Sequence, residues 1–192
     1  MPSTALCWFR RDLRLTDNPA LARALEVAER VVPLYIHSPD EDATWVPGAA
    51  SRWWLHHSLS ALSEALCESG SRLILTAGDS LASLRRVAEA CGATHVFWNR
   101  LYEPATVARD ARIKQQLRAD GLRCESFNAS LLFEPWEVAT GNRGPYRVFS
   151  AFWRNAAQGL RATAPLSAPR ALAPPPVDLD HLRIGDLGLL PR

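Results

Sequence analysis

An α/β fold with a doubly wound parallel sheet is predicted for this chain of 192 residues. Short apolar runs lie at 5–10, 30–37, 72–77, 94–99 and 123–128. Amphipathic helical patterns separate them, at 17–29, 51–69, 79–91 and 104–120. Strands that alternate with helices of this length predict right-handed crossovers between parallel strands. We therefore expect five parallel strands with helices on both faces of the sheet.

Residues that start and stop helices flank these patterns. Thr16 or Asp17 is expected to cap the first helix, ahead of Pro19, and Asp79 or Ser80 the third. The second helix is expected to start at Ser51, after Pro47-Gly48, and the fourth at Glu103, before Pro104. Glycines at 70, 92 and 121 follow the second, third and fourth helices, where a left-handed residue commonly ends a helix.

The alternation ends after residue 128. Residues 129–145 carry glycine and proline and are predicted to be irregular, and apolar residues then recur at helical spacing from Val148 to Trp153. Six of the 14 prolines fall in the last 30 residues. This composition predicts a semi-extended linker over 161–192 without a core of its own. We expect a domain over 1–160 at the front of a longer protein; the alternative is a natural disordered tail.

Composition narrows the class of protein. The formal net charge of +2 is far from the strongly basic balance of a nucleic-acid-binding domain. Four widely spaced cysteines at 7, 67, 91 and 124 form no metal-binding motif and are expected to be reduced, buried thiols. No run approaches the roughly 20 apolar residues that span a bilayer, and no signal peptide is evident.

Nucleotide-phosphate signatures are absent from the sequence. It contains no GxGxxG after the first strand and no GxxxxGK[ST], and Gly78-Asp79-Ser80 is interpreted as a helix cap. An open sheet binds ligands at the carboxyl ends of its strands. Two loops there, 37–42 and 99–104, mix aromatic, apolar and polar groups, as suits a flat aromatic ligand. Trp53 and Trp54 begin the intervening helix and, being adjacent, cannot share a face.

The loop after the first strand is dense in charge. Arg10, Arg11, Asp12 and Arg14 directly follow the apolar run from Ala5 to Phe9. Such charges are costly to pack unless they pair or face a ligand or another domain.

Several motifs of this sequence resemble the DNA photolyase/cryptochrome family. They are Trp8-Phe9-Arg10-Arg11-Asp12-Leu13-Arg14, Asp17-Asn18-Pro19-Ala20-Leu21, Ser51-Arg52-Trp53-Trp54-Leu55, Ser126-Phe127-Asn128, Leu132-Phe133-Glu134-Pro135-Trp136-Glu137 and Pro145-Tyr146-Arg147-Val148-Phe149. The resemblance covers about residues 5 to 160. The runs at 51–55 and 126–138 are most similar to class III cyclobutane pyrimidine dimer photolyases and plant cryptochromes.

The resemblance implies a Rossmann-like amino-terminal domain that binds a light-harvesting antenna chromophore. Methenyltetrahydrofolate is the first choice, with deazaflavin or a flavin as alternatives. It also implies a following helical domain, absent from this chain, that binds FAD and splits the pyrimidine dimer under blue light. Catalytic residues are therefore expected outside this chain, and the Arg10–Arg14 segment is expected to make structural and interdomain contacts.

The resemblance places the antenna in the groove at the carboxyl ends of the second and fourth strands. The residues expected to bind it are Tyr35, His37, Ser38, Ser51, Arg52, Leu55, Leu101, Tyr102 and Glu103. Two positions depart from other branches of the family. Leu101 stands where deazaflavin-binding members carry an acidic residue, and Ala105-Thr106 stand where an Asn-Glu pair holds folate in another branch.

Three functions remain open at this point. The first is the antenna domain of a photolyase that repairs cyclobutane pyrimidine dimers in damaged DNA. The second is a cryptochrome, a blue-light receptor that signals without repair. The third, a stand-alone nucleotide-binding module, is disfavoured by the missing phosphate loops. For the intact protein we expect a cytoplasmic bacterial monomer with no membrane contact.

Overall fold

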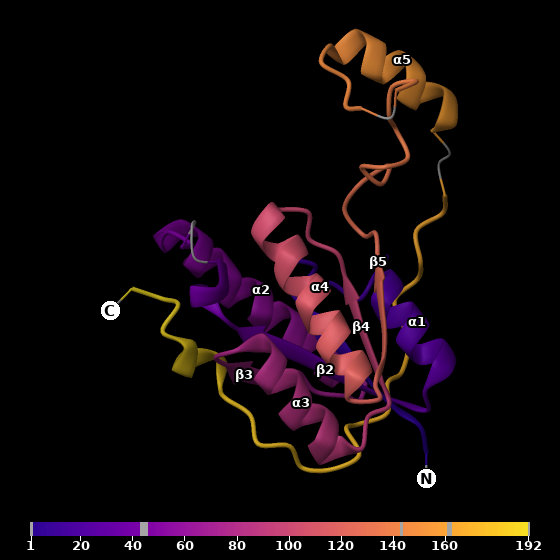
Figure 1. The fold of residues 1–192 in the computed structure, drawn as a ribbon. Coiled ribbons are helices and arrows are strands. Elements are labelled where there is room, and N and C mark those ends of the chain that lie inside the picture. The colour runs from indigo at the N-terminus through magenta and orange to yellow at the C-terminus, as the bar shows by residue number, and fades with distance from the viewer. Residues whose placement is uncertain (1, 43–45, 143, 161–162, 192) are drawn as a thin grey trace.

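A five-stranded, all-parallel sheet forms the centre of the molecule, in the order β3-β2-β1-β4-β5 (Figure 1). The computed structural model describes residues 2–42, 46–142, 144–160 and 163–191. The strands are β1 (Thr4–Phe9), β2 (Arg30–His37), β3 (Ile74–Ala77), β4 (His95–Asn99) and β5 (Arg123–Phe127). The chain moves outward from β1 to one edge and then to the other, which confirms the doubly wound α/β prediction.

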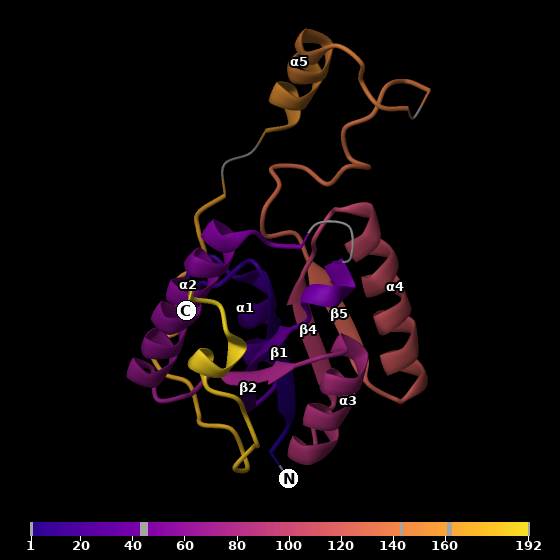
Figure 2. The same ribbon diagram turned by 90° about the vertical axis from the view of Figure 1, so that its left-hand side faces the viewer.

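Helices cover both faces of the sheet (Figure 2). The helices are α1 (Pro19–Val27), α2 (Ala49–Glu68), α3 (Ser80–Cys91), α4 (Pro104–Ala119) and α5 (Phe149–Gly159), with short 3-10 turns at Pro39–Asp42 and Ile184–Leu187. The first four begin and end within two residues of the predicted patterns.

Alternate residues of each strand point into two separate cores. On β1, Ala5, Cys7 and Phe9 pack with α1 and α2, whereas Leu6 and Trp8 pack with α3 and α4. All six β1 residues are buried, as expected for a central strand covered on both faces.

The helix caps differ in part from those predicted. Asn18, rather than Thr16 or Asp17, caps α1, and its side chain accepts from the Leu21 amide at 3.1 Å. Asp17 has a φ of 49°, a left-handed conformation unlike the extended backbone of a helix cap. Asp79 caps α3 as predicted, accepting from the Ala82 amide at 2.7 Å.

The start of α2 also differs from the prediction. This helix begins at Ala49, two residues before Ser51, and Gly48 precedes it with no side-chain cap.

Three of the four cysteines are buried, as expected, but Cys67 is exposed on α2. The helix turns Cys67 away from the core, while its neighbour Leu66 packs against the sheet. Burial raises the pKa of Cys124 to about 11 and also raises that of Cys7, whose thiol lies near Asp12 as well. All four are free thiols in this structure.

Residues 128–160 leave the α/β body and carry α5 at their far end (Figure 1). Phe149 and Trp153 stack with ring centroids 6.4 Å apart, yet both are exposed. Of the α5 residues, Ala156 is the one that is buried. The helix predicted from Val148 to Trp153 is therefore present, but its apolar face has little to pack against within the described residues.

The proline-rich segment after residue 163 returns along the body (Figure 1). Leu172 and Leu189 join the core on the α1–α2 side of the sheet and Leu179 the opposite core, so the segment contributes to packing that its composition did not predict. The Leu172 amide donates to the Ser69 carbonyl at 2.7 Å, and the Leu182 amide to Leu75 of edge strand β3 at 2.9 Å.

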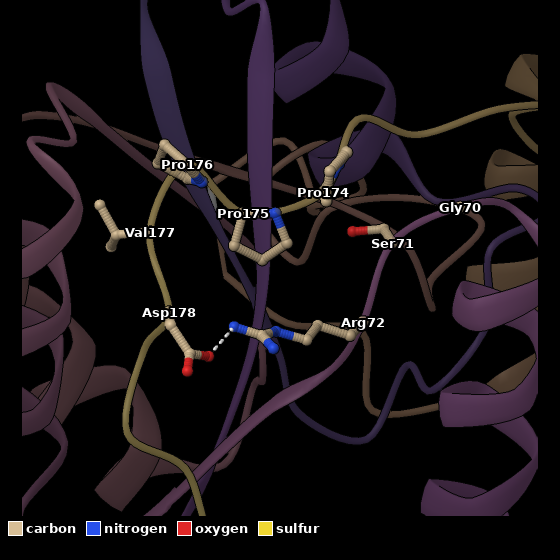
Figure 3. Close-up of a pocket in the computed structure, with 8 residues that line it drawn as sticks. All are labelled: Gly70, Ser71, Arg72, Pro174, Pro175, Pro176, Val177 and Asp178. Atoms are coloured by element: carbon tan, nitrogen blue, oxygen red, sulfur yellow. Dashed lines mark hydrogen bonds and ion pairs between the residues drawn. The ribbon is translucent and has the colours of Figure 1, made fainter.

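Figure 3 shows where this segment crosses the loop at Gly70–Arg72. Pro174, Pro175 and Pro176 lie across a shallow cavity of about 500 Å³. Arg72 closes one side through an ion pair with Asp178 at 2.6 Å. Within the described ranges, no helix is long and apolar enough to cross a membrane.

Candidate functional site

A cavity of about 890 Å³ opens at the carboxyl edge of the sheet, next to the first turns of α2. Its position follows from the topology, because the strand order reverses at β1 and the loops after β1 and β4 diverge there. The lining residues are Trp8, Arg10, Arg11, Leu13, Arg14, Tyr35, Ile36, His37, Ser38, Pro39, Pro47, Ala50, Ser51, Trp54, Leu55, Ser58, Ser80, Leu101 and Arg109.

Six of the nine residues expected to bind a chromophore line this cavity. They are Tyr35, His37, Ser38, Ser51, Leu55 and Leu101. The other three, Arg52, Tyr102 and Glu103, do not line it. Arg52 is exposed on the first turn of α2.

Tyr102 belongs to a polar cluster beside the cavity. Its hydroxyl donates to the Glu134 carboxylate at 3.0 Å, and the Arg100 guanidinium forms an ion pair with the same carboxylate. Burial disfavours the charge of Arg100, but the bonds to Glu134 and Tyr102 outweigh it and raise the pKa of Arg100. We call the projecting segment at 128–160 the arm. The cluster therefore links the first part of the arm, residues 128–137, to the loop after β4.

Glu103 forms an exposed ion pair with Arg11. Although partial burial opposes its charge, hydrogen bonds from its own backbone and from Arg11 lower the pKa of Glu103. Arg11 lines the cavity, so Glu103 acts on the site through this partner.

Hydrogen bonds link the residues that follow β2 to those that follow β3, at one side of the cavity. Ser38 Oγ donates to the Gly78 carbonyl at 2.6 Å and lies 3.1 Å from Ser80 Oγ. The Glu41 carboxylate accepts from the Ser80 amide at 2.6 Å and from its hydroxyl at 2.5 Å. A carboxylate therefore occupies the amino terminus of α3, where the helix dipole favours it.

Arg10 is buried, with 7% of its surface exposed, and pairs with Asp110 of α4 at 2.6 Å. Arg109 contacts the other Asp110 oxygen at 3.3 Å and Glu41 at 3.4 Å. Both guanidinium groups lie near the Trp8 ring, 4.9 Å and 5.6 Å from its centroid. The charge of Arg10 is therefore neutralised within this domain.

Asn99 connects the β1 loop to α1. Its amide nitrogen donates to Asp12 at 2.5 Å and to Asn18 at 2.8 Å, and its side-chain oxygen accepts from the Ala20 amide at 3.2 Å. Its backbone carbonyl accepts from Arg10. This network gives the loop a fixed shape, so the charged signature following β1 is in large part structural.

Arg14 is held by main-chain oxygens. Its Nη2 donates to the carbonyls of Asp17 at 2.9 Å and Ala129 at 2.8 Å, and its Nε lies 3.2 Å from the Thr16 carbonyl. Arg14 thus links the β1 loop to Ala129, two residues after the end of β5. It lines the cavity with Arg11 and Leu13.

The remaining wall of the cavity is apolar and aromatic. Tyr35, Ile36, Leu55 and Leu101 contribute to it, together with Trp54, which is 70% exposed. Partial burial lowers the pKa of His37, despite the opposing effect of Asp40, and so favours the neutral imidazole. Aromatic walls with a few polar groups can hold a planar ring system by stacking and hydrogen bonding.

The sequence did not indicate that Arg10 and Arg109 would both line the cavity. Arg10 and Arg109 meet through Asp110, which lies 100 positions from Arg10 in the chain. The charge density after β1 was the available signal, but the direction of those side chains depends on long-range partners. No group of three or more metal-binding side chains occurs in the part of the chain that the structure describes.

A family model for DNA photolyase matches residues 5–173. The chain belongs to the DNA photolyase family. It is 43% identical over 186 residues to the deoxyribodipyrimidine photo-lyase of Agrobacterium fabrum, an alignment covering 97% of this chain and 38% of that relative. It is 46% identical over 150 residues to Cryptochrome-1 of Arabidopsis thaliana, covering 78% of this chain and 22% of that protein.

A solved photolyase has the same fold. The crystal structure of a class III photolyase from Agrobacterium tumefaciens superposes with a TM-score of 0.93 and 41% identity, over 100% of this chain and 39% of that one. The resemblance to photolyases inferred from the Arg10–Arg14 and Ser51–Leu55 motifs is therefore confirmed. This chain spans well under half the length of these relatives.

Proposed function

We propose that this chain is the light-harvesting amino-terminal domain of a photolyase that repairs cyclobutane pyrimidine dimers in DNA with blue light and reduced FAD. The observation that supports this most is the 43% identity to a deoxyribodipyrimidine photo-lyase along 97% of the chain.

A cryptochrome is the second candidate, favoured by the 46% identity to Arabidopsis Cryptochrome-1. That alignment covers 78% of the chain, whereas the photolyase alignment covers 97%. The greater coverage supports repair over signalling.

The cavity fits an antenna chromophore in size and chemistry. Its volume of about 890 Å³ lies within the range of small-molecule sites, roughly 300–1,000 Å³. Tyr35, Leu55 and Trp54 would enclose the ring system, and Ser38 and His37 would meet its polar edge. When bound, such a chromophore absorbs near-ultraviolet or blue light and passes the excitation energy to FAD. Methenyltetrahydrofolate is our first choice, and deazaflavin or a flavin the alternative.

The partner of this domain would be the FAD-binding helical domain of the longer protein. The exposed aromatic face of α5 supports this, because stacked rings such as Phe149 and Trp153 are costly to leave in water. Damaged DNA would be bound through that second domain. We expect the intact protein to be a cytoplasmic monomer.

Photorepair by the full-length protein tests the function. An irradiated oligonucleotide, incubated with the reduced protein under blue light, is expected to regain intact thymines, as measured by chromatography. The same sample in the dark is the control. A light-dependent loss of dimers no greater than without protein would overturn the repair function and leave the cryptochrome candidate.

Trp54 tests the antenna site. Replacing it with alanine removes a ring that lines the cavity but packs little, so we expect about tenfold weaker chromophore binding with unchanged thermal stability. The matched control is Trp136→Ala, an exposed tryptophan that does not line the cavity. Equal chromophore content in both variants, measured by near-ultraviolet absorbance, would argue against this cavity.

A further inference from the structure

Lys114 is the only lysine of the chain, and its side chain lies between α4 and β5. The Nζ atom donates to Ser126 Oγ at 2.8 Å and lies 5.2 Å from the centroid of the Trp98 ring. The side chain is partly buried, whereas most lysines keep the ammonium group in water. The amine of Lys114 is therefore held in one place beside β5.

Two arginines lie next to this amine. Arg100 Nη1 donates to the same Ser126 Oγ at 3.3 Å, so its guanidinium is a direct neighbour of the Lys114 amine. Arg118 follows Lys114 by one helical turn and donates from Nη2 to the Cys124 carbonyl at 3.0 Å. Three cationic side chains thus gather along β5.

Negative charge is scarce around these cations. Arg100 has an ion pair with Glu134, but within the described residues neither Lys114 nor Arg118 has one. Neighbouring cations without a counter-charge repel one another, and water screens that repulsion less where the groups are partly buried. The cluster therefore favours the arrival of an anion, or the conversion of one cation into an anion.

The environment also makes Lys114 a better nucleophile than an exposed lysine. Burial lowers the pKa of Lys114, and the charges of Arg118 and Arg100 lower it further. Cys124 and Asp110 oppose this effect. The Asp110 carboxylate is already shared by two arginines, and the Cys124 thiol, with a pKa of about 11, is uncharged at neutral pH. More of the amine is therefore in its neutral, reactive form.

We propose that Lys114 combines with carbon dioxide to form a carbamate, and that Arg100 and Arg118 hold this carbamate as an anion. The amine nitrogen attacks the carbon of carbon dioxide, and the new N–C bond displaces one C–O π pair onto oxygen. The nitrogen then gives one proton to water, so the step needs no oxidant or reductant. A cation is replaced by a carboxylate that two guanidinium groups can bind through charge-assisted hydrogen bonds.

The chemistry of the cluster favours carbon dioxide over other electrophiles. Carbon dioxide is small and uncharged, so it can reach a partly buried amine. An acyl donor would leave a neutral amide, which gives the two arginines no counter-charge. The site is separate from the antenna cavity, because none of Lys114, Arg100 and Arg118 is among the described residues that line it. The proposal therefore does not depend on a bound chromophore.

Trapping experiments on the 192-residue chain test the reaction directly. The chain is equilibrated with isotopically labelled carbon dioxide, the carbamate is converted to its ethyl ester with triethyloxonium, and the peptides are identified by mass spectrometry. Arg86→Lys supplies a reference amine at an exposed position of α3 in the same molecule. At neutral pH, we expect the trapped fraction at Lys114 to be at least about tenfold that at position 86. Equal fractions at the two positions overturn the proposal.

A second variant separates binding of the anion from general reactivity of the amine. Arg118→Gln removes one neighbouring cation, so the amine holds its proton more tightly and reacts less with any electrophile. Acetylation by acetic anhydride, which gives a neutral product, measures that general effect. We expect carbamate formation to fall about tenfold further than acetylation, the factor for one charge-assisted hydrogen bond. Equal falls in the two reactions would show that Arg118 does not hold a carbamate and would overturn the proposal.

Arg112→Gln is the matched control for Arg118→Gln. Arg112 is an exposed arginine of the same helix, two positions before Lys114 and therefore on a different face. This substitution removes the same charge from the chain without removing a neighbour of the amine. We expect it to leave both reactions unchanged. A loss of carbamate equal to that in Arg118→Gln would show that net charge alone controls the reaction, and would likewise overturn the proposal.

Discussion

At the residue scale, the charge of Arg10 is tolerable in the interior because Asp110 neutralises it. Burial lowers the pKa of Arg10, and Asp110 opposes that effect. Replacing Asp110 with asparagine keeps the shape and removes the counter-charge. We expect the free energy of unfolding to fall by about 3 kcal/mol, since breaking a buried pair leaves an uncompensated charge. Urea denaturation measures this.

Asp120→Asn is the matched control for that substitution. Asp120 accepts from Arg85 at 2.6 Å, in a pair that lies at the surface and is screened by water. No measurable change in the urea midpoint is expected. Similar losses in the two variants would mean that burial does not distinguish the two ion pairs.

His37 gives the domain a pH dependence. Because burial lowers its pKa below the ordinary value of 6.5, the folded chain binds this proton less readily than the unfolded chain does. Stability from this group is therefore complete above pH 6.5 and falls as the pH drops below it. We expect His37→Gln to flatten the fall in melting temperature between about pH 7 and pH 5. His95 remains in both proteins, so an identical slope would exclude a contribution from His37.

At the element scale, the proline-rich segment acts as a strap over the body. Leu172 and Leu179 are buried in different cores, so each alanine substitution should lower stability by about 2–3 kcal/mol. Leu166→Ala is the matched control, because Leu166 is exposed and contributes no core packing. Thermal unfolding of the three variants measures the difference. Equal melting temperatures would show that the segment is a free linker, as its composition alone indicates.

The main elements could be predicted because local signals and tertiary packing agree. The strands begin and end within two residues of the apolar runs, and Asp79 caps α3 as expected. The packing of the strap could not be predicted. Its proline content predicts an extended chain, and no local signal shows that Leu172, Leu179 and Leu189 pack into the two cores. The α1 cap was ambiguous for a similar reason, since Thr16, Asp17 and Asn18 are all suitable and backbone conformation decides among them.

The candidate site could be predicted in part. The carboxyl-end rule and the family resemblance together placed residues from β2 and α2, such as Tyr35 and Leu55, beside one cavity. Trp8, Arg14 and Arg109 could not be assigned to it, because their directions depend on partners far away in the chain. Tyr102 does not line the cavity and hydrogen-bonds to Glu134 instead, and the spacing of the loop does not reveal that contact.

At the scale of the whole molecule, two parts differ in how well they are packed. The body holds a sheet with a core on each face. The arm at 128–160 projects from it and ends in a helix with exposed aromatic residues (Figures 1 and 2). An amphipathic helix gains most of its stability from packing of its apolar face. We therefore expect the body to be stable without a partner, and α5 to gain stability when its aromatic face is covered.

Hydrogen exchange tests that difference. α5 has 11 residues and α3 has 12, so length does not separate them, but six residues of α3 are buried and one of α5 is. In the 192-residue chain, we expect the amides of α5 to exchange at least about 100-fold faster than those of α3, because local opening of α5 disrupts few contacts. In the proposed longer protein, a covering domain should slow exchange in α5 and leave that in α3 unchanged. Equal protection of both helices in the isolated chain would show that α5 needs no partner to be stable.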